Sequence, residues 1–135
     1  MQIDESVDVL LRQKTVVIRA FYELFWSRYP EIKRQFEGVN VTHQATMLTM
    51  ALMMVEAYYS HDYPAAEHYL KVLGTRHKNY GARKEDYPKF RECLLETLAV
   101  IHAEDWDAEL ARQWGEAIDK ATAKMLEGYE DEYIF

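Results

Sequence analysis

The stretch PAAEHYLKVLGTRHKNYGARKEDY, residues 64–87, decides the fold of this chain. Leu70, Leu73 and His77 follow helical spacing, so an α-helix places the imidazole on the same face as two leucines. The proline that opens the stretch suits a first helical turn, where its missing N–H costs no hydrogen bond. Gly81 can take the left-handed conformation that ends a helix. The stretch therefore predicts a helix from this proline to about Gly81, with an inward-facing histidine near its C-terminal end.

An inward-facing histidine permits two interpretations. In the commoner case it is a core residue whose ring bonds to a backbone carbonyl, and in the other case it is a metal ligand. The position of His77 alone does not choose between them. The choice depends on what the other helices bring to the same place.

Composition predicts one folded domain over residues 1–135, since 49% of the residues are hydrophobic and 13% are aromatic. The net charge of -7 argues against nucleic acid or an anionic membrane as a partner. Cys93 is the only cysteine, so an intrachain disulfide is excluded and nothing indicates an oxidising compartment. The N-terminus lacks the features of a signal peptide, and no apolar stretch is long enough to span a bilayer. We expect a cytoplasmic protein.

Turn signals and periodicity predict an all-α chain. It has three prolines, five glycines and no strand-like alternation bounded by turn residues. The predicted helices cover about residues 5–13, 15–27, 30–36, 40–60, 64–81, 86–103 and 106–127. The acidic tail that ends the last helix, EGYEDEYIF, is expected to fray.

The predicted helix over residues 40–60 carries a stripe of methionines and other side chains at helical spacing, and we expect this stripe to face inward. Its members are His43, Met47, Met50, Ala51, Met54 and Tyr58. A methionine stripe is most often core packing, because the unbranched thioether fills irregular gaps. We therefore do not interpret the methionines themselves as a set of metal ligands.

The five histidines fall into two groups. His61, His68 and His102 lie in polar or loop-edge contexts. His43 and His77 lie on apolar faces of two different helices, an arrangement that can hold a planar metal cofactor from both sides. A haem needs a strong axial ligand, an apolar slot and control over the other face of the iron. The alternative is two unrelated core histidines.

Three segments resemble bacterial single-domain globins and the globin half of flavohaemoglobins. FYELFWSRYPEIKRQF, residues 21–36, resembles the second helix and corner of that family, with an aromatic pair, a YPE turn and a corner phenylalanine. LKVLGTRHKNYG followed by EDYPKF, within residues 70–90, is similar to the proximal segment, including a tyrosine ten residues after the histidine. WGEA, beginning at Trp114, resembles the start of the last-helix motif. The resemblance implies an all-α globin fold of six to seven helices around one haem b.

The resemblance also implies roles for individual residues. His77 becomes the proximal iron ligand, with Leu73 as a proximal wall. Phe36 becomes the ring stacked on the haem, and Tyr22 the distal hydroxyl that donates a hydrogen bond to bound dioxygen. The remaining implied haem contacts are Tyr80, Tyr87 and Phe90.

The distal gate falls near the start of the helix over residues 40–60. The alignment places His43 there, with Met47 one turn further along, and makes His43 a candidate sixth iron ligand when no gas is present. A shift by one residue places Gln44 in the gate instead. We prefer His43, because the shift would turn Glu56 inward and lose the apolar stripe.

The chain departs from the flavohaemoglobin pattern in two ways. In that family a tyrosine and a glutamate polarise the proximal histidine; Tyr87 matches the tyrosine, but Tyr129 stands where the glutamate is expected. Glu127 and Glu130 are the alternative carboxylates. No flavin and NAD reductase domain follows, so repeated redox turnover would need an external reductase.

The functional expectation follows from the resemblance. It is reversible binding of a diatomic gas, O2 first and NO or CO next, by a bacterial haem protein of the oxygen-transport type. The first alternative is an enzyme, a nitric oxide dioxygenase that uses an external reductase. The others are a gas or redox sensor domain and a haem-free interaction module.

Overall fold

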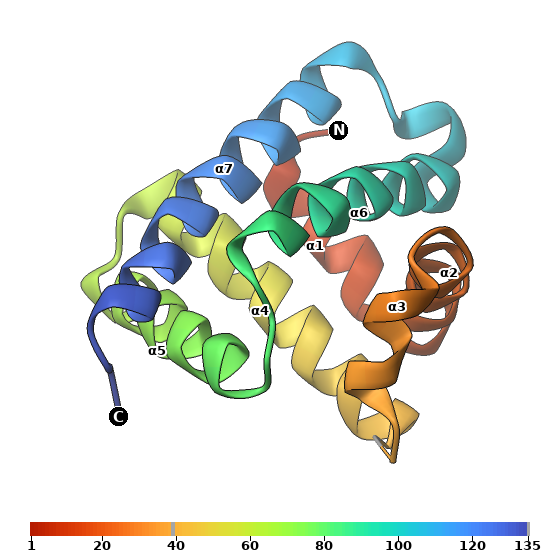
Figure 1. Ribbon diagram of the computed structural model, residues 1–135. Coiled ribbons are helices and arrows are strands. Elements are labelled where there is room, and N and C mark those ends of the chain that lie inside the picture. The colour runs from red at the N-terminus through yellow and green to blue at the C-terminus, as the bar shows by residue number, and fades with distance from the viewer. Residues whose placement is uncertain (39, 135) are drawn as a thin grey trace.

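The computed structural model describes residues 1–38 and 40–134, and these residues form seven α-helices and no strand (Figure 1). The helices are α1 Ile3–Leu11, α2 Lys14–Arg28, α3 Pro30–Lys33, α4 Val41–His61, α5 Pro64–Asn79, α6 Tyr87–His102 and α7 Ala108–Glu130. Short 3-10 turns lie at Arg34–Phe36, Lys84–Asp86 and Ala103–Asp105. The predicted all-α architecture of six to seven helices is confirmed.

Local side chains explain where the helices begin and end. The Asn40 side chain accepts a hydrogen bond from the His43 amide at 2.9 Å and caps α4. Asp107 caps α7 in the same way. Pro64 occupies the first turn of α5, and Gly81 follows that helix with a φ of +96°. Because these signals are local, the predicted boundaries of the long helices lie within three residues of the observed ones.

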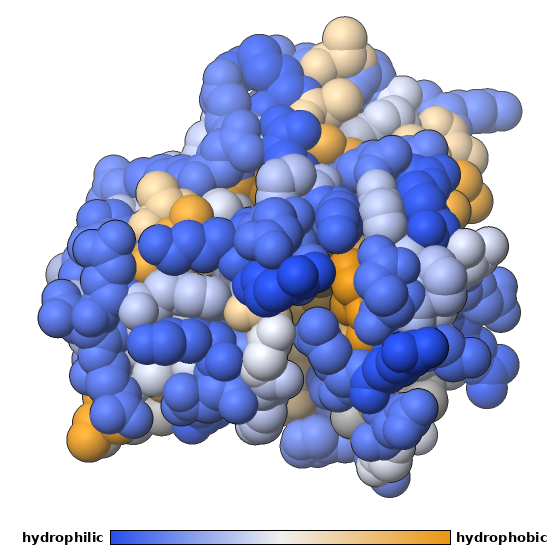
Figure 2. Space-filling model, in the orientation of Figure 1, coloured by the Kyte–Doolittle hydropathy of each residue, from blue (hydrophilic) through white to orange (hydrophobic). Residues whose placement is uncertain are grey.

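The helices surround a furrow on one face of the molecule. Figure 2 shows this furrow between the half that holds α5 and the half that holds α2 and α3, with apolar atoms at its floor. In the same orientation α4 crosses behind it (Figure 1). Within residues 1–38 and 40–134, no helix combines the length and the apolar character needed to cross a membrane.

The inward face of α4 differs from the predicted one. Of the predicted stripe only Tyr58 is buried; His43 and Met50 are exposed, and the other members are half-buried. The buried residues of α4 are Ala45, Leu48, Thr49, Leu52, Val55 and Tyr58. The helix is apolar around much of its circumference, so two neighbouring stripes satisfy the helical period. Packing against α1, α2 and α7 buries the stripe of leucines and valine and leaves the methionines at the edge.

His102 is the buried histidine that the sequence pattern missed. It is only 5% exposed, and its Nε2 lies 2.6 Å from Ser6 Oγ. The indole of Trp114 donates to the same Ser6 oxygen at 2.9 Å. This network ties α1 to α6 and α7, and it explains why a histidine beside a loop is satisfied inside the core.

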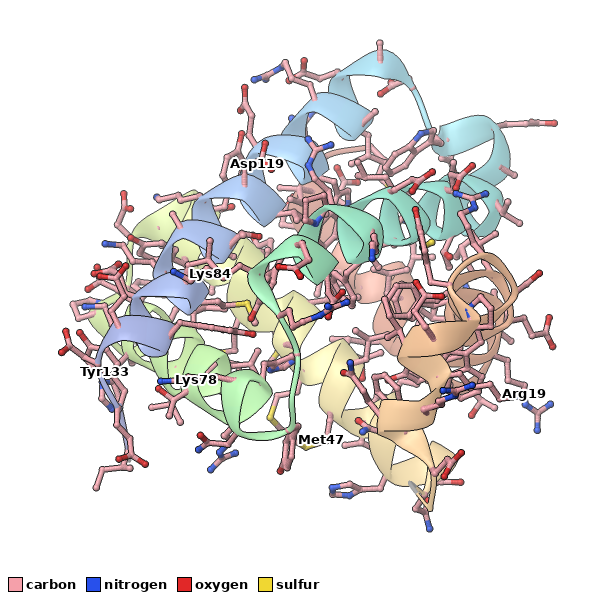
Figure 3. The ribbon with its side chains drawn as sticks, in the orientation of Figure 1. Arg19, Met47, Lys78, Lys84, Asp119 and Tyr133 are labelled. Atoms are coloured by element: carbon pink, nitrogen blue, oxygen red, sulfur yellow. The ribbon has the colours of Figure 1, made fainter. Side chains whose placement is uncertain are left out.

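The C-terminal tail is held against α5, and the prediction that it frays is wrong for the described residues. Thr75 Oγ1 donates to the Gly128 carbonyl at 2.9 Å and accepts from the Tyr133 amide at 3.1 Å. Lys78 Nζ donates to the Tyr129 carbonyl at 3.0 Å, and Lys71 Nζ lies 5.4 Å from the centre of the Tyr133 ring. Figure 3 shows Lys78 and Tyr133 on the same side of the molecule. The lysines of α5 compensate the acidic composition that suggested fraying.

α5 and α7 pack backbone to backbone through two glycines. A Cβ atom on Gly128 would lie 2.6 Å from the Thr75 amide nitrogen, and one on Gly74 would lie 2.7 Å from Met125 Cα. Contacts this short leave no room for any side chain. The close contact of the two helix backbones fixes the position of α5 against α7, and so the position of the helical turn that carries His77.

Candidate functional site

His77 lies in the last turn of α5 in the form that a metal ligand requires. Its Nδ1 lies 2.8 Å from the Leu73 carbonyl oxygen. A carbonyl oxygen only accepts, so Nδ1 carries the proton and Nε2 keeps its lone pair. Burial lowers the pKa of the imidazole, and the carbonyl bond opposes this shift with a smaller effect. The ring is therefore neutral, with one nitrogen oriented by its backbone bond and the other available for coordination.

Two tyrosines lie beside His77. The Tyr87 ring centre lies 6.5 Å from that of His77, and the Tyr129 ring meets Tyr87 edge-on at 5.9 Å. The Tyr129 hydroxyl donates to the Ala82 carbonyl at 2.7 Å. Burial raises the pKa of the Tyr87 hydroxyl, and the neighbouring Tyr129 hydroxyl raises it further. Among the described residues, no group meets full hydrogen-bond geometry with the Tyr87 oxygen. The structure thus brings Tyr87 to His77, and both phenols are neutral.

The two carboxylates that could replace the expected glutamate form ion pairs with lysines. Glu127 pairs with Lys124 at 3.0 Å, and Glu130 with Lys84 at 3.8 Å. Tyr129 therefore packs against Tyr87 at the position where the resemblance implies a glutamate. A neutral phenol that donates to a loop carbonyl polarises the imidazole less than a carboxylate would.

Tyr22, on α2, is the residue that the resemblance assigns to the gas-binding side. It is 8% exposed, and burial raises the pKa of its hydroxyl to about 12, so the group stays protonated and can donate. Its ring stacks on Trp26 with centres 4.6 Å apart and lies 5.2 Å from Phe36. The α3 corner thus brings Phe36 beside Tyr22, as the resemblance implied. Trp26 was not predicted as part of the site, although its spacing of four residues from Tyr22 indicated a shared helix face.

The start of α4 offers two polar residues near this side. His43 is exposed, whereas Gln44 is half-buried. The observed inward stripe contains Leu48 and Leu52, which follow Gln44 at intervals of four residues. The reason for preferring His43, its place on an inward apolar stripe, is therefore wrong. Met47 is half-buried, and in the view of Figure 3 it lies between α4 and the loop that follows α5.

The remaining predicted haem contacts differ in how far their side chains are exposed. Leu73 is half-buried in α5. Phe90 is half-buried in α6 and meets the Phe21 ring edge-on at 5.0 Å. Tyr80 is 74% exposed at the end of α5, so its side chain extends into solvent. The helical pattern did not show this, because Tyr80 lies where α5 unwinds toward Gly81.

The side chains present fit a haem. His77 offers an unprotonated Nε2, and no group in the described part of the chain meets full hydrogen-bond geometry with the buried Tyr87 oxygen. The predicted contacts Phe36, Met47, Leu73 and Phe90 are all half-buried, so each keeps apolar surface that a flat hydrophobic molecule can cover. A haem site requires this combination of one strong axial ligand and an apolar lining.

Comparison with known proteins agrees with this geometry. The family described as Globin matches residues 19–125. A flavohemoprotein of Bacillus thuringiensis subsp. konkukian (strain 97-27) is 31% identical over 120 residues, 87% of this chain and 29% of that protein. An uncharacterized globin-like protein of Aquifex aeolicus (strain VF5) is 26% identical over 117 residues, 87% of this chain and 81% of that protein. Anaerobic nitrite reductase HBII of Casuarina glauca is 39% identical over 56 residues, 42% of this chain and 35% of that protein.

This chain belongs to the globin family. The predicted globin fold and the resemblance to bacterial globin domains are thereby confirmed. The chain spans 29% of the length of the flavohemoprotein that it matches.

Proposed function

We propose that this globin holds one b-type haem through His77 and reversibly binds a diatomic gas, with O2 as the first candidate. The observation that carries the proposal is the bond between His77 Nδ1 and the Leu73 carbonyl, which leaves Nε2 ready to coordinate. Membership of the globin family supports the choice of haem. When bound, the haem supplies the iron at which a gas molecule coordinates.

The residues of the chain hold the haem, exclude water from it and donate a hydrogen bond to the gas. His77 Nε2 would coordinate the haem iron, and the hydrogen bond to the Leu73 carbonyl keeps the imidazole ring oriented. Phe36, near Tyr22 at the α3 corner, supplies an apolar wall that excludes water. The protonated Tyr22 hydroxyl donates a hydrogen bond to a polar gas ligand and leaves an apolar one unaffected.

Absorption spectra test this proposal directly. The purified protein titrated with haem should show a Soret band at one equivalent, and reduction followed by exposure to O2 should shift it reversibly. A protein that shows no Soret band would leave the haem-free interaction module as the remaining function. Reversible loading without turnover would favour gas binding over catalysis.

Nitric oxide dioxygenase activity is the second candidate. The relatives named flavohemoprotein match 87% of this chain, which favours it. In this reaction NO, O2 and one electron combine to give nitrate, and a reductase must supply that electron for each turnover. The Tyr129 hydroxyl, bonded to Ala82, argues for the weaker proximal polarisation of a binding protein. Steady nitrate production in the presence of NADH and a flavin reductase would decide for the enzyme.

Tyr22→Phe should release O2 faster while leaving CO release nearly unchanged. The hydroxyl is protonated, and a hydrogen bond to a partly charged ligand contributes about 1.5 to 3 kcal/mol, roughly a ten- to hundredfold effect on dissociation. CO carries little charge and gains little from the donor. Stopped-flow dissociation rates for both gases make the comparison. Equal changes for O2 and CO would assign the ring a steric role instead.

Substitutions at the start of α4 should identify the distal polar residue that lies nearest the bound gas. We expect Gln44→Ala to change O2 dissociation more than His43→Ala does, because Gln44 is half-buried and His43 is exposed.

The His43→Ala variant also tests whether His43 itself binds the iron when no gas is present. A low-spin ferric spectrum that becomes high-spin in His43→Ala would show that this histidine binds the iron. A five-coordinate wild-type ferrous spectrum would exclude such ligation in the reduced state.

A further inference from the structure

We propose that a diatomic ligand reaches the Tyr22 side of the site along α2, and that the indole of Trp26 is the gate of this route. The inference rests on the proposed function, because a route is meaningful only if gas binds beside Tyr22. It differs from the sequence-based expectation, which placed the gate at the start of α4.

Two surface hollows meet at Trp26. One, of about 470 Å³, is lined by Ile18, Arg19, Tyr22, Glu23 and Trp26. The other, of about 320 Å³, is lined by Trp26, Pro30, Lys33, Arg34, Phe36 and Glu37. Arg19, which lines the first hollow, is directed away from the helices in Figure 3. A water molecule takes up about 30 Å³, so either hollow admits a diatomic molecule easily. The barrier to the interior is therefore the layer of aromatic rings that lines the two hollows.

Three rings make up that layer. Tyr22 and Trp26 stack at 4.6 Å with 10° between their planes, and Phe36 lies 5.2 Å from Tyr22 and 5.9 Å from Trp26. Tyr22 and Phe36 are the residues assigned to the gas-binding side. Trp26 alone lines both hollows and touches both of these rings. Tyr22 itself lines the first hollow and Phe36 the second, so moving the Trp26 side chain would open the wall between these rings from either hollow.

The hydrogen bonding of Trp26 favours such a movement. Its Nε1 is buried and has no hydrogen-bond partner in the part of the chain that the structure describes. A buried donor without a partner is unfavourable, so a swing toward either hollow would let the N–H reach water. Ring stacking and the Lys33 ammonium, 5.7 Å from the indole centre, hold the closed position. In Trp114, by contrast, the Nε1–H donates a hydrogen bond to Ser6 Oγ, which holds that indole in one position.

A gate has a kinetic signature that a binding contact lacks. Since the ligand enters and leaves by the same route, opening the gate raises association and dissociation by the same factor and leaves the affinity unchanged. A residue that contacts the bound ligand changes dissociation and affinity together. Rate measurements on Trp26 variants can therefore separate a gate from a ligand contact.

Laser photolysis of the CO complex provides the test. Trp26→Ala should raise both CO rates by roughly fivefold or more, because the stacked ring that holds the closed position is removed. Glu23→Trp, a surface change that fills the first hollow, should lower both rates. Val16→Trp adds the same ring to an exposed site of α2 outside the hollows and should change neither.

The outcomes separate this inference from the proposed function. Absence of a Soret band after haem titration would overturn the proposed function itself. A haem protein that binds CO with unchanged rates in both Trp26→Ala and Glu23→Trp would overturn the gate alone. A change in dissociation with no matching change in association would also overturn it, as would rate changes confined to the His43→Ala and Gln44→Ala variants. If Trp26→Ala does not fold, Trp26→Phe takes its place, because its smaller ring should also raise both rates, and unchanged rates in Trp26→Phe would overturn the gate.

Discussion

A His77→Ala variant is expected to lose tight haem binding, with an affinity at least about a hundredfold lower than that of the wild type. His77 is the residue that offers a neutral, oriented nitrogen in the last turn of α5. Removing it leaves only apolar contacts to retain the haem. Titration of the haem-free protein, followed at the Soret band, measures the loss. Added imidazole should restore binding in part, because it can occupy the space of the missing ring.

The control for this experiment is His61→Ala. His61 is exposed at the end of α4 and stacks on Tyr63, so its loss should leave haem affinity unchanged. Full haem content with an unaltered ferrous spectrum in His77→Ala would overturn the assignment of the proximal ligand. A loss in both variants would indicate general damage to the fold.

Gly128→Ala is expected to destabilise the protein by at least about 2 kcal/mol, although alanine favours a helix over glycine by about 1 kcal/mol. The new Cβ would lie 2.6 Å from the Thr75 amide nitrogen, and backbone atoms of a packed helix cannot move aside as a side chain can. Gly74→Ala should act in the same direction, because its Cβ would meet the backbone of Met125. Urea unfolding followed by circular dichroism gives the change in the free energy of unfolding.

Gly115→Ala is the matched control on the same helix. Its Cβ would lie 3.0 Å from the end of the Arg91 side chain, which is flexible and can yield. Here the helix preference of alanine should dominate, and the variant should be as stable as the wild type or more stable. If Gly128→Ala and Gly115→Ala behave alike, the close approach of α5 and α7 is not a determinant of stability. Because α7 positions α5, Gly128→Ala should also weaken haem binding.

Much of the site could be predicted from sequence because its signals are local. The proline, the leucine spacing and Gly81 placed His77 in the last turn of a helix, and the structure has the helix there. The resemblance of residues 21–36 to the globin family assigned Tyr22 and Phe36 to the same site, and their rings lie 5.2 Å apart. For His77, a few neighbouring residues set the position through helix period and a turn.

The face of α4 could not be predicted in this way. Methionines and leucines both repeat at helical spacing on this helix, so hydrophobic periodicity permits two inward faces about one residue apart. Contacts with α1, α2 and α7 bury Leu48 and Leu52 and leave His43 exposed. The assignment of the distal polar residue depended on that choice, and this is why sequence reasoning favoured His43 over Gln44.

The sequence by itself determined the helical class, the approximate helix boundaries and the position of His77, because each depends on short-range patterns of residues, and the resemblance of three segments indicated the globin family. Only the tertiary structure decided which residues meet across helices that are distant in the chain. In the tertiary structure His102 is buried against Ser6, and the backbones of α5 and α7 meet at Gly74 and Gly128. The Tyr129 hydroxyl donates a hydrogen bond to the Ala82 carbonyl. The physical reason is that such contacts depend on the relative rotation and separation of whole helices. These quantities follow from the packing of all the side chains together, and no local pattern specifies them.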